Sequence, residues 1–257
     1  MPVGVGEKKP SPELRIGCCG FPQVLDRYAR SFPVVEVQQT FYQPPPFKTL
    51  EKWRAQVPPE FEFTLKAWQV ITPEASSPTY RRMREKLTDA QRGEVGAFRI
   101  NDTVMSAWHR TLECARALGS RVILFQCPAR FLPTRENKAN LRAFFREITG
   151  ELSTRQDGEQ FTCVWEPRGE WKPEEVADLC EELGLVHAVD PFQQEPVTAG
   201  LGYFRLHGRT GYRYRYTDDD LKRLLELAPS RLACYVLFNN ISMLEDARRF
   251  QQLCSTG

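Results

Sequence analysis

The sequence lacks long apolar runs, an excess of either charge and any extended low-complexity tract. Lys and Arg number 35 against 33 Asp and Glu, so the net charge is +2 over 257 residues. No stretch approaches the roughly 18 uninterrupted apolar residues of a membrane helix, and the opening MPVGVGEKKPSPE has no apolar signal-peptide core. These absences exclude membrane, secreted and disordered proteins, so we expect a cytoplasmic protein with no membrane partner. A charge this mild neither requires nor excludes nucleic acid.

Cysteine is present, but not in a pattern typical of a zinc or redox centre. None of the eight cysteines belongs to a C-x-x-C pair, and five lie in or beside apolar runs. We therefore predict that they are small buried hydrophobic residues in a reducing compartment. Cys18 or Cys127 as a reactive thiol is the alternative.

Short apolar runs alternate with helical patterns along almost the whole chain. The predicted strands are residues 15–19, 34–38, 61–68, 121–126, 161–166, 186–190, 203–207 and 234–239. The predicted helices are residues 24–32, 49–57, 102–118, 137–148, 173–183, 217–227 and 242–254. The helix at 102–118 begins at an Asp suited to capping. The link from 191 to 202 has no clear helical pattern.

Eight strand–helix units in about 245 residues predict a parallel sheet closed into a single (β/α)8 barrel, an α/β fold, over residues 14–257. Residues 1–13 read as a flexible tail. An open, doubly wound sheet is the alternative. It usually carries a glycine-rich phosphate loop after its first strand, whereas this turn reads GCCGFP.

Polar residues interrupt several of these strands, always at every second position. Strands of a parallel barrel are buried on both faces, and successive side chains point to opposite faces. Because the apolar set must meet the helices, the polar set must point into the barrel. This set comprises Glu36, Gln38, Thr40, Glu62, Thr64, Lys66, Trp68, Glu166, Arg168, Asp190, Arg205 and His207. The charges form either a buried ion network that fixes strand register or a functional site at the carboxyl ends of the strands.

Five of these polar residues are candidates for catalysis: Glu36, Lys66, Glu166, Asp190 and His207. Glu166 ends the fifth strand, and His207 ends the seventh, before a glycine that permits close approach of a ligand. Pairing of Glu166 with Arg168, or of Lys66 with Glu36, is the structural alternative. We expect the other two histidines, His109 and His187, to be structural, with His187 packing outward.

The loop GRTGYRYRY at 208–216 alternates cationic and aromatic side chains. Such alternation suits phosphate contact with base or sugar stacking, and it also suits an ordinary surface loop. The candidates for substrate binding are Tyr42, Trp68, Arg168, Arg205, Arg213, Tyr214, Arg215 and Asn239.

Six ordered motifs at the strand ends resemble a known family. They are VVEVQQTFYQPP, FTLKAWQVIT, LFQCPARF, VWEPRGEW, YFRLHGR with the later YRY, and YVLFNN. Together they are similar to the family called domain of unknown function 72, the YecE-like proteins, from about Arg15 to the C-terminus. WEPRGEW, KAWQVIT and SSPTYRRM resemble its archaeal-type branch. GCCGF replaces the G-T-S-G-W that is common in bacteria, which leaves no counterpart for the serine of that motif.

The resemblance implies a TIM barrel and does not supply a reaction. The positions characteristic of the family map onto Glu36, Thr40, Tyr42, Lys66, Gln126, Glu166, Arg168, His207 and Asn239, which adds Gln126 to the substrate-binding candidates. A looser analogy links the barrel to the xylose-isomerase-like folds, which hold divalent metals near their later strand ends. By that analogy Glu166, Asp190 and His207 are metal-ligand candidates for Mg or Mn, although Asn239 or Asn240 replaces an acid at the eighth strand.

Three functions are compatible with this set of residues. The first is a hydrolase, nuclease-like, that acts on nucleic acid or a nucleotide by activating water. The second is a sugar-phosphate isomerase or lyase with Lys66 or Glu166 as the proton abstractor. The third is a non-catalytic barrel that binds nucleic acid. The expected partner is therefore nucleic acid or a phosphorylated small molecule.

Overall fold

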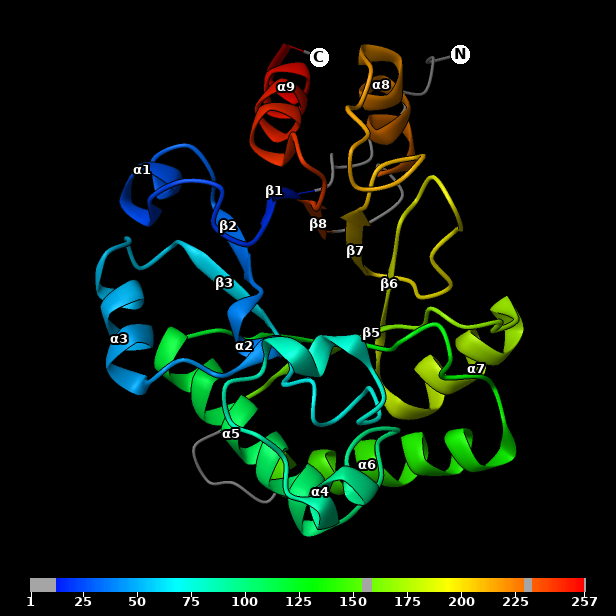
Figure 1. Ribbon diagram of the computed structural model, residues 1–257. Helices are drawn as coiled ribbons and strands as arrows, with labels where there is room; N and C mark the ends of the chain where they lie inside the picture. Colours follow the sequence, from blue (N-terminus) through cyan, green and yellow to red (C-terminus); the bar gives the residue numbers. More distant parts are fainter. Residues whose placement is uncertain (1–12, 154–158, 229–232, 257) are drawn as a thin grey trace, which may run out of the picture.

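Residues 13–153, 159–228 and 233–256 are described by a computed structural model, in which eight parallel strands close into a barrel (Figure 1). The strands pair in chain order, and the last pairs with the first. They are β1 (Glu13–Cys19), β2 (Val34–Val37), β3 (Glu62–Lys66), β4 (Val122–Gln126), β5 (Thr162–Glu166), β6 (Val186–Val189), β7 (Leu201–Leu206) and β8 (Ala233–Phe238). All eight predicted strands and the (β/α)8 barrel are confirmed, and the open sheet is wrong.

The helices surround this barrel, and all seven predicted ones are present. They are α1 (Leu25–Ala29), α3 (Phe47–Ala55), α5 (Asp102–Leu118), α6 (Arg135–Ser153), α7 (Pro173–Leu183), α8 (Asp218–Leu227) and α9 (Met243–Thr256). Three shorter elements were not predicted, because four to six residues are too few for a helical period: α2 (Gln39–Tyr42), the 3-10 helix η1 (Pro78–Arg82) and α4 (Asp89–Glu94). Residues 191–200 contain only turns and irregular chain, as predicted.

The beginning of the chain departs slightly from the prediction. Residues 1–12 of the predicted tail lie outside the described residues, whereas Glu13, its last residue, already belongs to β1 and pairs with Ala233 of β8. Among the residues that the structure describes, no helix has the length and apolar character that crossing a membrane requires.

Apolar side chains pack on both sides of the strands. An outer cluster fills the space between strands and helices, where Trp108 of α5 packs against Phe125 of β4 and Phe144 of α6. A smaller inner cluster fills the barrel and includes Val164 and Tyr203. The cap of α5 differs from the prediction, because the side chain of Asn101, not Asp102, accepts the N–H of Val104 at 3.0 Å. Gly119 ends this helix in the left-handed region, at φ 66°.

The connection between β3 and α5, residues 67–101, carries η1 and α4 and lies across one side of the face seen in Figure 1. Its two ends are fastened together by three backbone hydrogen bonds, which run from the N–H groups of Gly96, Ala97 and Phe98 to the carbonyls of Val70, Thr72 and Ile71. Gly96 has φ +86°, and Ala97 and Phe98 also lie in the left-handed region, at φ 51° and 55°. Burial of the Phe98 ring among four other phenylalanines helps to offset this backbone strain.

Gly96→Ala should therefore be clearly destabilising. A Cβ at this position would lie 2.5 Å from the carbonyl oxygen of Pro73, and the backbone would remain at a φ that L-residues avoid. We expect a loss of about 2–3 kcal/mol in the free energy of unfolding, measured by urea denaturation. Gly150→Ala in α6 is the matched control, where a Cβ meets nothing within 4 Å, so it should stabilise by about 0.5–1 kcal/mol. Equal effects of the two changes would contradict the strain at Gly96.

Candidate functional site

The polar residues predicted to face inward do share the interior of the barrel. Tyr203, Val164 and Ala188 belong to the inner cluster, whereas their chain neighbours Phe204 and Trp165 pack in the outer one. Glu36, Lys66, Gln126, Glu166 and Arg205 follow this inner parity and lie near the carboxyl ends of β2, β3, β4, β5 and β7. The sidedness inferred from alternation is therefore correct.

Arg205 is the hub of this inner layer and is fully buried. Its Nε and Nη2 donate to both carboxylate oxygens of Glu36, at 3.0 and 2.8 Å. Its Nη1 donates to Glu166 Oε2 at 2.5 Å and to Gln126 Oε1 at 3.1 Å. Tyr203 donates its hydroxyl to Glu36 Oε2 at 2.8 Å. One guanidinium thus joins carboxylates from opposite sides of the barrel, in the bidentate geometry that only Arg provides.

The charges of this layer hold one another ionised. Burial alone would raise the pKa of Glu166, but Arg205 and Arg168 bring it well below the ordinary range. Burial likewise opposes ionisation of Glu36, and Arg205 lowers the pKa of that carboxyl. Burial disfavours the charged guanidinium too, yet the two carboxylates raise the pKa of Arg205 well above its usual value. The predicted pairing of Glu36 with Lys66 is therefore wrong, since Arg205 takes both oxygens of Glu36.

Lys66 lies in the same layer, and it has no ion pair with any residue that the structure describes. Its side chain is 5% exposed, and its ammonium lies 3.6 Å from the centre of the Phe41 ring, a cation–π contact. Within residues 13–153, 159–228 and 233–256, no carboxylate lies within salt-bridge distance of Lys66 and no hydrogen bond of its Nζ is found. Burial, followed by the charge of Arg205, lowers the pKa of Lys66 to about 7.

Above this layer, Arg168 and His207 reach the surface beside Glu166. Arg168 Nε donates to Glu166 Oε1 at 3.0 Å, and the Nε2 of His207 lies 3.1 Å from the same oxygen. Arg168 Nη2 lies 2.7 Å from that Nε2, and Asn239 Nδ2 lies 3.1 Å from His207 Nδ1. Arg168 can only donate a hydrogen bond, and ionised Glu166 can only accept one. The Nε2 of a neutral His207 can therefore either accept from Arg168 or donate to Glu166, but not both at once. The imidazole is therefore held between a hydrogen-bond donor and an acceptor.

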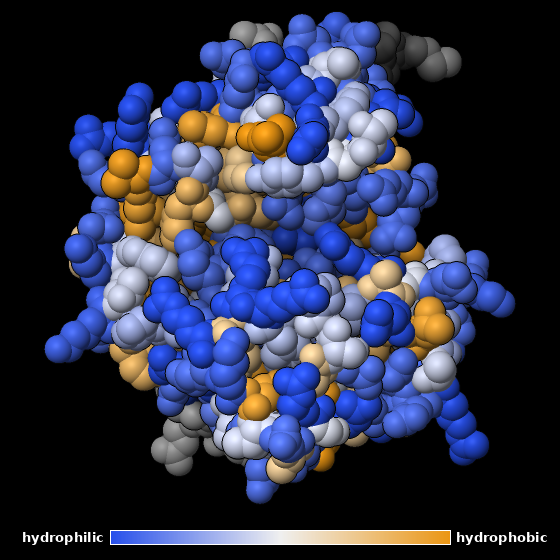
Figure 2. Space-filling view, viewed as in Figure 1, coloured by the Kyte–Doolittle hydropathy of each residue, from blue (hydrophilic) through white to orange (hydrophobic). Residues whose placement is uncertain are grey.

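A cavity of about 600 Å³ opens directly over these residues. Glu166, Arg168, Asp190, His207 and Asn239 contribute to its wall, and the hollow near the centre of Figure 2 is bordered by hydrophilic side chains. The volume falls within the range of about 300–1,000 Å³ that is usual for small-molecule sites.

Asp190 forms the wall of this cavity on the side of β6. Its Oδ2 accepts the backbone N–H of His207 at 3.0 Å, and its Oδ1 accepts that of Phe192 at 3.1 Å. Burial raises the pKa of Asp190 above its ordinary range, despite these hydrogen bonds. The Asp190 carboxyl in this cavity therefore keeps its proton to a higher pH than a free carboxyl does.

The proposed metal ligands Glu166, Asp190 and His207 do not fit a divalent ion. No group of three or more His, Cys, Asp or Glu in metal-binding arrangement occurs in the described part of the chain. Both Glu166 oxygens accept from guanidinium groups, and both Asp190 oxygens accept from backbone N–H groups. A Mg or Mn ion would have to displace Arg168 or Arg205 and remain beside the positive charges. The metal-site hypothesis is therefore wrong for this donor set.

Several predicted binding residues lie elsewhere or are already engaged. Trp68 follows the end of β3, so strand alternation no longer orients it, and it lines a separate cavity beside α5. Tyr42 packs its ring against Arg82, whose guanidinium carbon lies 3.5 Å from the ring centre. Tyr214 donates its hydroxyl to Asp220 of α8, and Arg215 pairs with Glu245 of α9. These four are not brought to the cavity.

The rest of the 208–216 loop is divided between core and surface. Tyr216 is buried, and its hydroxyl oxygen accepts the backbone N–H of Gly208 at 2.8 Å, so this side chain is part of the core. Arg213 is exposed, and Tyr212 is 57% exposed and borders the cavity. The loop is therefore not a continuous stacking surface.

The remaining histidines and cysteines behave as structural residues. His109 lies on α5 beside Glu151, and His187 packs on the outer side of β6, as predicted. All eight cysteines are free, and seven are buried. Burial raises the pKa of Cys18 to about 12 and also raises that of Cys127, so the reactive-thiol alternative is not supported.

Sequence reasoning missed Tyr203, Gln193 and Gln194. Tyr203 shares the parity of Arg205 and His207, so the same alternation could have placed it in the barrel. Gln193 and Gln194 border the cavity from the turn after β6, where their N–H groups bond to the carbonyl of Asp190. No periodic signal marks residues in such a turn.

Comparison with known proteins agrees with this architecture. Residues 19–256 match the family described as protein of unknown function DUF72. The UPF0759 protein YunF of Bacillus subtilis is 26% identical over 248 residues, which cover 85% of this chain and 80% of YunF.

Solved structures with the same fold include members of this family and of other families. A DUF72 family protein of Enterococcus faecalis has a TM-score of 0.67 at 21% identity, with 95% of this chain and 98% of that one covered. A xylose isomerase domain containing protein of Salmonella typhimurium has a TM-score of 0.58 at 11% identity, with 96% and 97% covered. Identities this low show the TIM barrel fold alone and no activity. The archaeal-type branch stays a prediction, whereas the family match spans almost the whole chain: this chain belongs to the DUF72 family.

Proposed function

We propose that the protein is an isomerase or lyase that acts on a small, phosphate-bearing sugar by proton transfer between its own side chains and the substrate. The observation that carries this proposal is the meeting of Arg168, His207 and Asp190 in one cavity of small-molecule size. An anion-binding guanidinium there lies beside two groups able to exchange protons.

The roles follow from the contacts. The side chain of Arg168 is 37% exposed, so its outer N–H groups are available to a phosphate, while its Nε stays bound to Glu166. His207 and Asp190 are the two proton-transfer groups, one to remove a proton beside a carbonyl and one to return it to the neighbouring atom. Glu166 is a positioning residue, because a carboxylate held ionised by two guanidiniums is a weak base. This replaces Lys66 and Glu166 as the proposed proton abstractors.

The site favours this function over the nuclease-like hydrolase. The hydrolase hypothesis had Glu166, Asp190 and His207 hold a divalent ion or activate water, and the carboxylate oxygens of Glu166 and Asp190 already accept from guanidinium and backbone N–H groups. The 208–216 loop, whose pattern suits phosphate contact and base stacking, offers little support for the nucleic-acid-binding alternative, because Tyr214 and Arg215 bond to neighbouring helices. The free, buried thiols suit a reducing compartment, so we also propose a cytoplasmic location.

Exchange of substrate hydrogen with solvent would test the proposal. In D2O, the protein should introduce deuterium beside the carbonyl of at least one member of a panel of aldose and ketose phosphates, detected by proton NMR. His207→Gln should reduce the exchange rate about 100-fold or more. Arg168→Lys should mainly raise KM, since it keeps the charge and loses the planar contact.

His109→Gln is the matched control, because it makes the same change on the outer surface of α5. Its exchange rate should equal that of the wild type. Exchange that persists in His207→Gln, or its absence for every sugar phosphate with the wild type, would contradict the proposal.

A further inference from the structure

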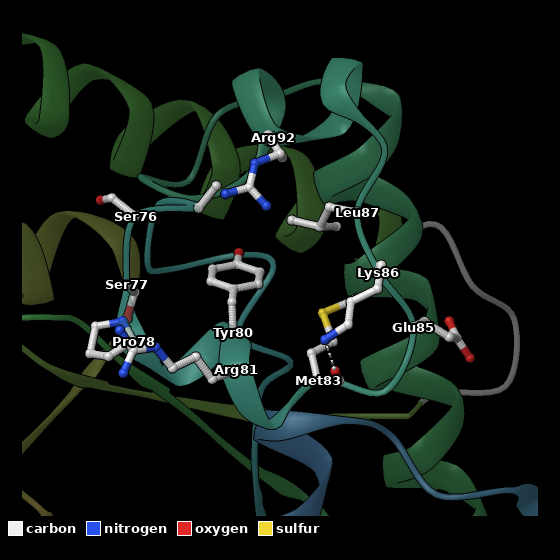
Figure 3. A pocket seen from close by; sticks show the side chains of 11 residues that line it. Ser76, Ser77, Pro78, Tyr80, Arg81, Met83, Glu85, Lys86, Leu87 and Arg92 are labelled. Atoms are coloured by element: carbon white, nitrogen blue, oxygen red, sulfur yellow. Dashed lines mark hydrogen bonds between the residues drawn. The ribbon is translucent and has the colours of Figure 1, made fainter.

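A second cavity lies outside the barrel mouth, in the connection between β3 and α5 (Figure 3). It has a volume of about 370 Å³ and is built from η1, the start of α4 and the chain between them. None of its lining residues belongs to the wall of the cavity over Glu166. It is therefore a separate place on the molecule.

The polar part of this cavity is dominated by positive charge. Arg81, Lys86 and Arg92 line it, and Glu85 is the one acidic residue among the described residues of its wall. In Figure 3 the Glu85 carboxylate points away from the group, while the Arg92 guanidinium points inward toward Tyr80. No salt bridge of Arg81, Lys86 or Arg92 is found among the described residues, and Lys86 Nζ contacts only the Met83 carbonyl, at 3.5 Å. Three cationic residues thus line the cavity without a salt-bridge partner among the described residues: the Arg92 guanidinium points inward, the Arg81 side chain runs beside Pro78, and the Lys86 amine turns toward Met83.

The opposite part of the cavity is apolar and held in place. Tyr80 stands at its centre, with Met83 and Leu87 beside it. The Tyr80 hydroxyl donates to the Pro73 carbonyl at 3.0 Å, which fixes the ring. The cavity therefore presents an aromatic and apolar wall next to a cationic one.

The backbone around the cavity is also fixed before any ligand binds. Ser77 caps η1, and Thr88 with Gln91 forms a capping box at the start of α4. Arg130 Nη1 donates to Ser76 Oγ at 3.1 Å, which ties this segment to the β4–α6 loop. A preformed cavity loses little free energy to ordering when a ligand enters.

We propose that this cavity binds a phosphate monoester that carries a planar or apolar group, as a second ligand site distinct from the mouth of the barrel. The phosphate binds at Arg92, whose guanidinium points into the cavity, Arg81 and Lys86 add positive charge at its edges, and the attached group packs on Tyr80 and Leu87. Phosphate is the ligand that clustered Arg and Lys side chains recognise best.

Binding measurements with adenosine 5′-monophosphate, inorganic phosphate and adenosine test this site. Isothermal titration should show that the monophosphate binds more tightly than phosphate alone and that adenosine does not bind measurably. The triple variant R81Q/K86Q/R92Q should weaken binding of the monophosphate at least tenfold. Because the three side chains are exposed, the variant should keep the wild-type circular dichroism spectrum and Tm.

Two further variants locate the effect. R27Q/K48Q/K52Q makes the same change in net charge on α1 and α3, at exposed residues without ion pairs in the described chain, and should bind like the wild type. Arg168→Gln alters only the mouth of the barrel and should also leave binding unchanged. Equal binding by the R81Q/K86Q/R92Q variant, or loss of binding with Arg168→Gln instead, would overturn the proposal. So would binding of single-stranded DNA through these residues without binding of the monophosphate.

Discussion

Arg205→Met should be among the most destabilising single substitutions in this chain. It removes the cation that both Glu36 and Glu166 contact, and leaves two buried carboxylates without their main partner. Breaking a buried ion pair by removing one side typically costs about 3–5 kcal/mol, so we expect a loss of at least about 4 kcal/mol near pH 7. Urea unfolding followed by circular dichroism would measure it.

The loss should depend on pH in a definite direction. In the wild type, Arg205 lowers the folded-state pKa of the Glu36 and Glu166 carboxyls. The stabilisation that Arg205 provides is therefore fully present above the pKa of a glutamate in the unfolded chain. It is lost as the pH falls through the lowered folded-state pKa values. In Arg205→Met the carboxyls can protonate more easily. The difference between variant and wild type should therefore shrink as the pH falls below about 5.

Arg215→Met is the matched control, since it removes an Arg from an exposed pair with Glu245. Exposed pairs add little to stability, so this variant should unfold like the wild type. The triple change E36L/E166M/R205M should recover part of the stability by removing the charges altogether. If Arg205→Met and Arg215→Met behaved alike, Arg205 would not be the hub of the interior.

The inward direction of these residues was predictable, but their pairing was not. Alternation along a strand buried on both faces places Glu36, Lys66, Glu166 and Arg205 in the barrel whatever the rest of the chain does. Which charges meet depends on how far each side chain reaches across the barrel. Glu36 and Arg205 are 169 positions apart in the sequence. Nothing in the sequence indicates that the long, forked Arg205 side chain reaches across the barrel to Glu36 while Lys66 turns toward Phe41.

The connection between β3 and α5 was the least predictable part of the fold. Its helices are too short to show a period, and only the Thr88–Gln91 capping box marks one of them in the sequence. Trp68 was assigned to the barrel because the predicted strand ran two residues beyond Lys66, where the observed strand ends. Once a strand ends, parity says nothing of where the next side chains point.

Lys66→Met should have the opposite effect to Arg205→Met and stabilise the protein. The folded protein lowers the pKa of Lys66 from its ordinary value of 10.5 to about 7, because the charged amine is buried and lies near Arg205. Below pH 7 both folded and unfolded chains carry the proton, and the folded state bears the full cost of burying the charge. That cost is at most about 5 kcal/mol from the pKa difference, so we expect Met to add about 3 kcal/mol at pH 6.

The gain should disappear as the pH rises. Between about pH 7 and 10.5 the unfolded chain binds a proton that the folded chain has released, so wild-type stability increases across this window, whereas Lys66→Met has no such ionisation. Lys48→Met on the exposed face of α3 should show neither the gain nor its pH dependence. Reduced stability of Lys66→Met at every pH would mean that the amine has a partner which stabilises its charge. A buried amine that destabilises the barrel is the kind of residue that function retains at the expense of stability. The deuterium-exchange assay with sugar phosphates should therefore be repeated with Lys66→Met.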